Sequence, residues 1–199
     1  GLGDVYKRQS DNGPWLVFDE QGGSAGLLRG GKGSTWEGGM RVPGIAWWPS
    51  VVRPNSVCRE MASTMDFLPT FCSLAGAELP QERVLDGVDL SPVLRCNEAV
   101  VPAEASSRKA YFYYRGYQLM AARVGPWKAH FKTQSGYGQR EPETHDPPLL
   151  FHLEHDPSEK VEVAAKHAPV LARIAAIVAR HQADWDPAPS QLERKIGEE

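Results

Sequence analysis

The most regular pattern of apolar and polar residues lies between residues 169 and 185. Apolar side chains recur there three, four and seven positions apart, which is the spacing of one helix face. Pro169 suits a first helical turn. We therefore predict an amphipathic helix of about five turns that packs on a sheet. Its apolar face would consist of Val170, Leu171, Ile174, Ile177, Val178, His181 and Trp185.

Short apolar and aromatic segments precede this helix and are typical of strands. Two of them are separated by Gly125-Pro126, which indicates a hairpin. The polar residues 135–148 are expected to form a loop. The predicted strands of this antiparallel sheet are 110–114, 118–124, 127–133 and 149–153.

The first part of the chain is dominated by glycine. Glycines are so dense in residues 10–44 that a regular helix is excluded. We expect a long ordered loop of the kind that carries function on a rigid scaffold. Residues 42–48 are apolar, contain Pro43 and end at Pro49, and they predict a strand near a sheet edge.

Two short helical elements are predicted after this strand. The first covers residues 66–76, with Asp66 as its cap and Gly76 as its end. The second is a single turn around Val93 and Leu94. The polar, proline-containing residues 97–108 then mark a boundary between two parts of the chain.

Composition excludes several classes of protein. The chain has 199 residues, of which 41% are hydrophobic and 24% charged, so a packed core is expected rather than disorder. A net charge of −3 argues against binding to nucleic acid through bulk charge. No apolar run approaches the roughly 20 residues of a membrane span. The cysteines, expected to be small buried apolar groups, are Cys58, Cys72 and Cys96.

Two motifs in the glycine-rich segment could carry chemistry. Asp11-Asn12-Gly13 offers a carboxylate and an amide oxygen, the ligands that Ca²⁺ or Mg²⁺ prefers. The same tripeptide also forms ordinary turns. Lys32, among glycines, could approach an oxyanion closely, or it could be an exposed lysine. A nucleotide-binding loop is not favoured, because Gly33 stands where that motif needs Ser or Thr.

A third motif is expected to have a structural role. Residues 37–43 have the pattern E-G-G-x-R-x-P, in which the glycine pair makes a turn. Glu37 and Arg41 are expected to pair across it.

Together these blocks resemble the type I sulfatases, nearest to arylsulfatase A and N-acetylgalactosamine-6-sulfatase. The most specific match is GGKGSTWEGGMRVPG at residues 30–44, preceded by SDNG at residues 10–13. The resemblance extends to about residue 185. It continues through MDFLPT at 65–70, LDGVDLSP at 85–92, WKAHF at 127–131 and PLLF at 148–151.

The resemblance implies an α/β, alkaline-phosphatase-like fold. Residues 10–104 would be the last part of the large α/β domain, and residues 105–199 a smaller antiparallel sheet with a final helix. In the family, the Asp and Asn of S-D-N-G bind a divalent cation, usually calcium, and they correspond to Asp11 and Asn12. The lysine that binds the sulfate corresponds to Lys32. His145 lies in a loop similar to one that reaches the substrate pocket, although a surface histidine is an equal alternative.

The sequence departs from the family in two respects. The family nucleophile is a formylglycine made from a C-x-P-x-R motif, and none of the three cysteines begins such a motif. The chain also lacks the Asp-Asp pair that completes the metal site. Both lie upstream of S-D-N-G in the family, so the resemblance implies a C-terminal part that is inactive alone. Residues 1–9 are polar where an apolar strand is expected, which suggests a non-native leader.

The implied activity is hydrolysis of sulfate esters with a divalent cation, on a sulfated small molecule or glycan. Two alternatives remain. The chain could be a non-catalytic product that binds sulfated glycan, or part of a phosphoesterase of the same superfamily. The resemblance implies a periplasmic, secreted or lysosomal location. The sequence does not indicate the substrate alcohol or the oligomeric state.

Overall fold

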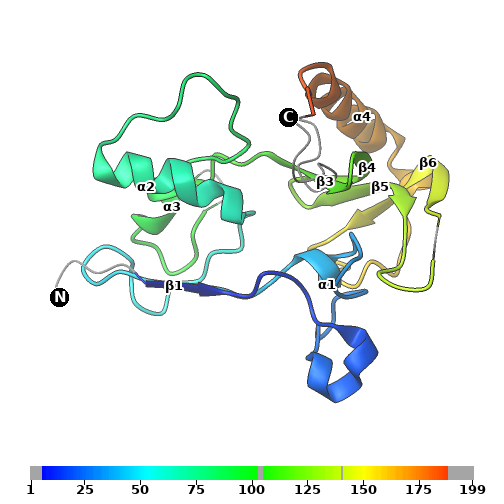
Figure 1. Cartoon of the computed structure of the whole chain (residues 1–199), viewed down its shortest axis with the longest axis horizontal. Coiled ribbons are helices and arrows are strands. Elements are labelled where there is room, and N and C mark those ends of the chain that lie inside the picture. Colours follow the sequence, from blue (N-terminus) through cyan, green and yellow to red (C-terminus); the bar gives the residue numbers. More distant parts are fainter. Residues whose placement is uncertain (1–5, 103–104, 140, 188–199) are drawn as a thin grey trace, which may run out of the picture.

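The computed structural model describes residues 6–102, 105–139 and 141–187. Figure 1 shows the elements in two groups. The first group contains β1 (Tyr6–Gln9), α2 (Phe67–Ala75) and α3 (Ser91–Leu94). The second group is a sheet covered on one side by the last helix. The short helix α1 (Glu37–Met40) lies against this second group, although it belongs to the first part of the sequence.

The second group is built on an antiparallel sheet in the order β3-β4-β5-β6. Val124 pairs with Trp127 across the predicted turn, which confirms the hairpin. The strands are β3 (Ala110–Arg115), β4 (Gln118–Val124), β5 (Trp127–Thr133) and β6 (Glu143–His152).

The last strand begins earlier than predicted. Residues 143–148 were expected in a loop, but β6 begins at Glu143, which pairs with Thr133. Pro147 and Pro148 concealed the strand, because proline cannot donate to a ladder. The strand tolerates them because β6 is at the sheet edge and its register with β5 is irregular in this region.

The predicted amphipathic helix is confirmed as α4 (Ala168–Ala183). Ile174 and Val178 are buried in a core with residues of β4, β5 and β6. Burial of such a side chain contributes about 1.5–3 kcal/mol, so this face holds the helix on the sheet. The helix ends before Trp185, whose ring lies 5.1 Å from that of Tyr114. Among the described residues, no helix is long and apolar enough to cross a membrane.

The first group contains a two-stranded antiparallel sheet. β1 pairs with β2 (Gly44–Trp47), and Gln9 lies opposite Gly44. This confirms the strand predicted within residues 42–48. Of the expected leader, residues 1–5 lie outside the described part of the chain. Residues 6–9 form β1, and a non-native origin stays a prediction.

The glycine-rich segment is not a continuous loop. It contains a 3-10 helix, η1 (Leu16–Gly22), and the single α-helical turn α1, which includes Gly38 and Gly39. Space requires a glycine at position 38, because a Cβ atom there would lie 2.3 Å from the carbonyl oxygen of Gly30. Packing therefore overrides the low helix propensity of the glycine pair.

The helix predicted at residues 66–76 is confirmed as α2, but the predicted side-chain cap by Asp66 is absent. Gly76 has φ 66° and ends α2 as expected. Asp66 makes no side-chain cap to α2; its carboxylate instead accepts a hydrogen bond from Ser63 N in a capping box around η2 (Thr64–Asp66). Asp66 is fully buried and forms an ion pair with Arg108, which lies two positions before β3. The predicted turn at residues 93–94 is confirmed within α3.

The cysteines are less buried than expected. Cys58 is exposed, whereas Cys72 and Cys96 are half-buried. All three are free thiols.

Candidate functional site

The three residues singled out as metal or sulfate ligands line one large groove. Asp11 and Asn12 follow directly after β1, and Lys32 lies between η1 and α1. Asp11 is exposed, whereas Asn12 and Lys32 are half-buried. The fold thus brings the two candidate motifs, some twenty residues apart in sequence, to the same opening.

Backbone hydrogen bonds fix the two motifs to each other. Gly13 N donates to Gly39 O at 3.0 Å, and Lys32 N donates to Pro14 O at 2.8 Å. A Cβ atom at position 13 would lie 1.8 Å from the carbonyl oxygen of Gly38. Glycine at position 13 is therefore required by the close approach of two backbones.

The charges of the two motifs have no ionic partner within the described part of the chain. Neither the Asp11 carboxylate nor the Lys32 ammonium takes part in an ion pair there. Lys32 Nζ lies 5.1 Å from the centre of the Trp15 ring, within the range of a cation–π contact. One oxygen ligand and one cation are thus available in the groove for groups from outside.

Aromatic side chains form a rim beside Lys32. The Trp15 ring meets that of Phe18 edge-on at 4.5 Å, and it stacks with that of Tyr137 at 6.3 Å. All three side chains are exposed, and Trp15 lines the groove. The rim joins residues from two distant parts of the chain next to the candidate anion site.

A buried ion-pair cluster, which was not predicted from the sequence, lies between the glycine-rich segment and the C-terminal sheet. Lys128 Nζ donates to Glu37 Oε1 at 2.8 Å and to the carbonyl of Thr35 at 2.7 Å. Glu37 and Lys128 are 1% and 0% exposed, so the pair is fully desolvated. The predicted pairing of Glu37 with Arg41 is wrong. Arg41 contributes only its backbone N–H to Glu37 O, and the carboxylate turns toward the sheet, where Arg123 is a second cation at 3.4 Å.

Glu159 completes this cluster from the other side. Its Oε2 accepts a hydrogen bond from Glu37 N at 2.7 Å, at the start of α1. Its Oε1 lies 2.7 Å from His130 Nε2 and 3.3 Å from Lys128 Nζ. The cluster therefore joins α1 to β5 and to the turn before α4.

Burial and charge set the protonation states in the cluster. Burial opposes ionisation of Glu37, but Lys128, helped by Arg123 and Tyr113, outweighs it and keeps the pKa of Glu37 below its ordinary value. Burial lowers the pKa of His130 from 6.5 to about 4, against the raising effect of Glu159. His130 Nδ1 has no hydrogen-bond partner among the described residues. The arrangement fits a neutral imidazole that donates from Nε2 to Glu159.

One local signal could have revealed part of this cluster. Lys128 and His130 stand two positions apart in β5, so they point to the same face, opposite the buried Ala129. Two successive polar residues on one face of a strand in the predicted core indicate a buried polar partner. The identity of that partner could not be inferred, because Glu37 is 91 residues away.

His145 is not brought into the site by this structure. Its Nε2 lies 2.8 Å from Thr133 Oγ1, and its side chain is 12% exposed. It does not line the groove that contains Asp11 and Lys32. Across residues 6–102, 105–139 and 141–187, there is also no group of three or more His, Cys, Asp or Glu side chains placed to hold a metal ion.

Both parts of the chain match models of known protein families. The family model described as "Sulfatase" matches residues 8–77, and the model for the C-terminal region of aryl-sulfatase matches residues 106–197. Steryl-sulfatase of Mus musculus is 39% identical over 198 residues, which cover 87% of this chain and 31% of that protein. Arylsulfatase A of Bos taurus is 38% identical over 206 residues, covering 92% and 39%. The chain thus spans only about a third of these relatives.

Solved structures agree with the sequence matches. The chain superposes on the PsFucS1 sulfatase from Pseudoalteromonas sp. with a TM-score of 0.78 and 26% identity, covering 90% of this chain and 36% of that one. The fold is therefore the α/β, alkaline-phosphatase-like fold of sulfatases, as predicted. Because the two sulfatase family models together match most of the chain, and relatives named as sulfatases are 38–39% identical to it, the chain belongs to the sulfatase family.

Proposed function

We propose that the protein containing this chain hydrolyses sulfate esters, with Asp11 and Asn12 as ligands of a divalent cation and Lys32 as a sulfate-binding residue. The observation that carries the proposal is the shared groove. It brings a carboxylate and a lysine, neither with an ionic partner among the described residues, to one opening. The lysine suits the anionic oxygens of a sulfate ester directly, and the carboxylate would act on them through a bound divalent cation.

The donor set fits a hard cation such as calcium. Asp11 supplies a carboxylate and Asn12 an amide oxygen, and calcium prefers oxygen ligands. Because Ca²⁺ takes roughly six to eight ligands, further oxygens must join these two. In this proposal they come from outside the described residues, as does the formylglycine nucleophile. When bound, the cation would polarise the sulfate oxygens.

Lys32 would hold an oxygen of the sulfate group. Its backbone N–H is bonded to Pro14 O at 2.8 Å, so the loop that carries it is fixed before the substrate arrives. A fixed positive group stabilises the anionic oxygens of the sulfate group and the negative charge that grows on the departing oxygen as the S–O bond breaks. The substrate would be a sulfated small molecule or glycan, because the aromatic rim of Trp15, Phe18 and Tyr137 can contact either an apolar ring or a sugar face.

Turnover of an aryl sulfate by the full-length protein tests the activity. The complete reading frame is expressed, and release of nitrophenol from nitrophenyl sulfate and from nitrophenyl phosphate is compared. We expect faster release from the sulfate and a loss of about a hundredfold or more in Lys32→Ala. Lys166→Ala, at an exposed lysine far along the chain, is the control and should keep wild-type turnover. Wild-type turnover in Lys32→Ala, or a preference for the phosphate, would contradict the proposal.

Calorimetry tests the metal ligands separately from activity. Titration of calcium into the full-length protein should give a binding signal that Asp11→Ala weakens by about tenfold or more. Asp19→Ala, at an exposed aspartate in η1, should leave the affinity unchanged. Equal calcium affinity in wild type and Asp11→Ala would remove Asp11 from the site.

A further inference from the structure

We propose that Arg115 and Gly136 are positioning residues for Lys32, so that the C-terminal sheet determines where the sulfate-binding ammonium stands. This inference rests on the proposed function of Lys32. It extends that function by assigning a role to two residues of the other part of the chain. Neither residue lines the groove, so both would act through the backbone of the lysine loop.

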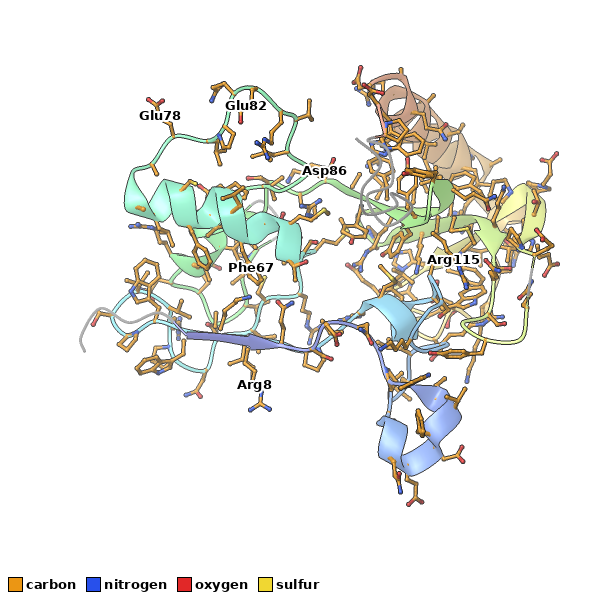
Figure 2. All side chains as sticks on the ribbon, in the orientation of Figure 1. Arg8, Phe67, Glu78, Glu82, Asp86 and Arg115 are labelled. Carbon is orange, nitrogen blue, oxygen red and sulfur yellow. The ribbon has the colours of Figure 1, made fainter. Side chains whose placement is uncertain are left out.

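Arg115 bridges the two parts of the chain. It is the last residue of β3, and Figure 2 shows it on the side of the sheet near the α1 segment. Its Nη1 donates to the carbonyl of Gly33 at 3.1 Å and to the carbonyl of Ser135 at 3.1 Å. One guanidinium group thus ties the residue after Lys32 to the loop between β5 and β6. Arg115 forms no ion pair among the described residues, so its contacts are directional hydrogen bonds to carbonyls.

Gly136 touches Lys32 itself. A Cβ atom at position 136 would lie 2.3 Å from the carbonyl oxygen of Lys32. Gly33 faces the same contact, because a Cβ atom there would lie 3.1 Å from Gly136 Cα. The φ of Gly136 is not in the left-handed region, so the close approach alone excludes a side chain at this position.

These contacts fix the Lys32 backbone on three sides. Its N–H is bonded to Pro14 O, its carbonyl lies against Gly136, and the next carbonyl is held by Arg115. The lysine loop therefore cannot shift unless the loop at residues 134–139 shifts with it. Electrostatic stabilisation depends on such fixed placement, and a displacement of about 1 Å is enough to reduce it strongly.

Inhibition of the full-length protein by inorganic sulfate measures this placement directly. Gly136→Ala forces Lys32 away from its position, and Arg115→Gln removes the bridge. Both should raise the inhibition constant of sulfate about tenfold, which corresponds to loss of one charge-assisted contact. Gly138→Ala is the matched control. It strains the same loop through its φ of 80°, but its Cβ atom would meet nothing within 4 Å. Its inhibition constant should stay at the wild-type value.

Two further readouts separate positioning from stability and from charge. The thermal midpoint of each variant is measured, because a purely structural role would lower the midpoint without changing the sulfate inhibition constant. Arg115→Lys keeps the charge but not the planar fork, so it should restore only part of the affinity. Full restoration by lysine would assign the effect to charge and refute the positioning role of Arg115.

The outcome also distinguishes this inference from the function on which it rests. If Lys32→Ala weakens sulfate inhibition while Gly136→Ala and Arg115→Gln do not, the positioning role is wrong and the function of Lys32 stands. If Lys32→Ala itself leaves sulfate inhibition unchanged, the proposed function fails first.

Discussion

Glu37 and Lys128 form a fully buried ion pair, 2.8 Å apart, although they are 91 residues apart in the sequence. Glu37 begins the helical turn that follows the lysine loop, and Lys128 lies in the middle of the C-terminal sheet. The pair therefore joins the segment that carries the candidate ligands to the part of the chain that carries the core. The surrounding contacts from Glu159 and Thr35 compensate the cost of burying two charges.

Lys128→Met should destabilise the protein more than Glu37→Gln does. Loss of Lys128 leaves two buried carboxylates, Glu37 and Glu159, without their shared cation, which costs about 3–5 kcal/mol. In Glu37→Gln, Lys128 keeps Glu159 as its partner, so the loss should be smaller. Urea unfolding of the full-length protein measures both values. Lys132→Met, in the same strand but outside any ion pair of the described residues, is the control. Equal losses in all three variants would show that the cluster contributes little.

His130 should make stability depend on pH below neutrality. Burial lowers its pKa in the folded state to about 4, from 6.5 when it is unfolded. The unfolded chain therefore binds more protons in this range. The contribution of the neutral His130 to stability is fully present above pH 6.5 and is lost as the pH decreases toward 4. The limiting slope for one group is about 1.4 kcal/mol per pH unit.

The comparison with His130→Gln isolates this effect. Glutamine can still donate to Glu159, but it does not titrate. Glu37, whose pKa is lowered, loses its own contribution at lower pH in both proteins. The unfolding free energy of the wild type should therefore decrease more steeply than that of the variant from pH 6.5 downward. Parallel curves would mean that His130 is already charged in the folded protein.

Gly13→Ala should disrupt the connection between the two candidate motifs. The new Cβ atom would stand 1.8 Å from the carbonyl oxygen of Gly38, so one of the two backbones must move. We expect a loss of stability of about 3 kcal/mol or more, as for other substitutions that force strain into a packed site. Gly44→Ala, where a Cβ atom meets nothing within 4 Å, should be nearly neutral. Denaturant midpoints of the two variants provide the comparison.

Sequence patterns predicted correctly those elements that depend only on neighbouring residues. The period of apolar residues predicted α4, and Gly125-Pro126 predicted the β4–β5 turn. The same kind of rule failed where a partner far along the chain decides the outcome. Asp66 satisfies the sequence requirements of a helix cap, yet Arg108, 42 residues later, determines its actual role. The start of β6 was missed because its pairing with β5 tolerates two prolines.

The candidate site also divides into residues that short motifs indicate and residues whose role depends on distant partners. Asp11, Asn12 and Lys32 were predicted from short motifs and from the resemblance that these motifs carry, and their roles stay predictions. The residues that support them could not be identified in this way. Gly136 resembles any loop glycine until its contact with the carbonyl of Lys32 is known, and Glu159 resembles any turn residue until Lys128 and His130 are placed beside it.

The buried pair of Asp66 and Arg108 should contribute far more than the exposed pair of Glu82 and Arg83. Arg108→Met leaves a carboxylate of 0% exposure whose remaining hydrogen bonds, among the described residues, come from the N–H groups of Ser63 and Val88. We expect a loss of about 3–5 kcal/mol. Arg83 and Glu82 are both 66% exposed, so Arg83→Met should change stability by less than about 1 kcal/mol. Urea unfolding of both variants tests the contrast. A small loss in Arg108→Met would mean that water reaches Asp66 once the arginine is removed, and that the two parts of the chain are held together mainly by the cluster of Glu37, Lys128 and Glu159.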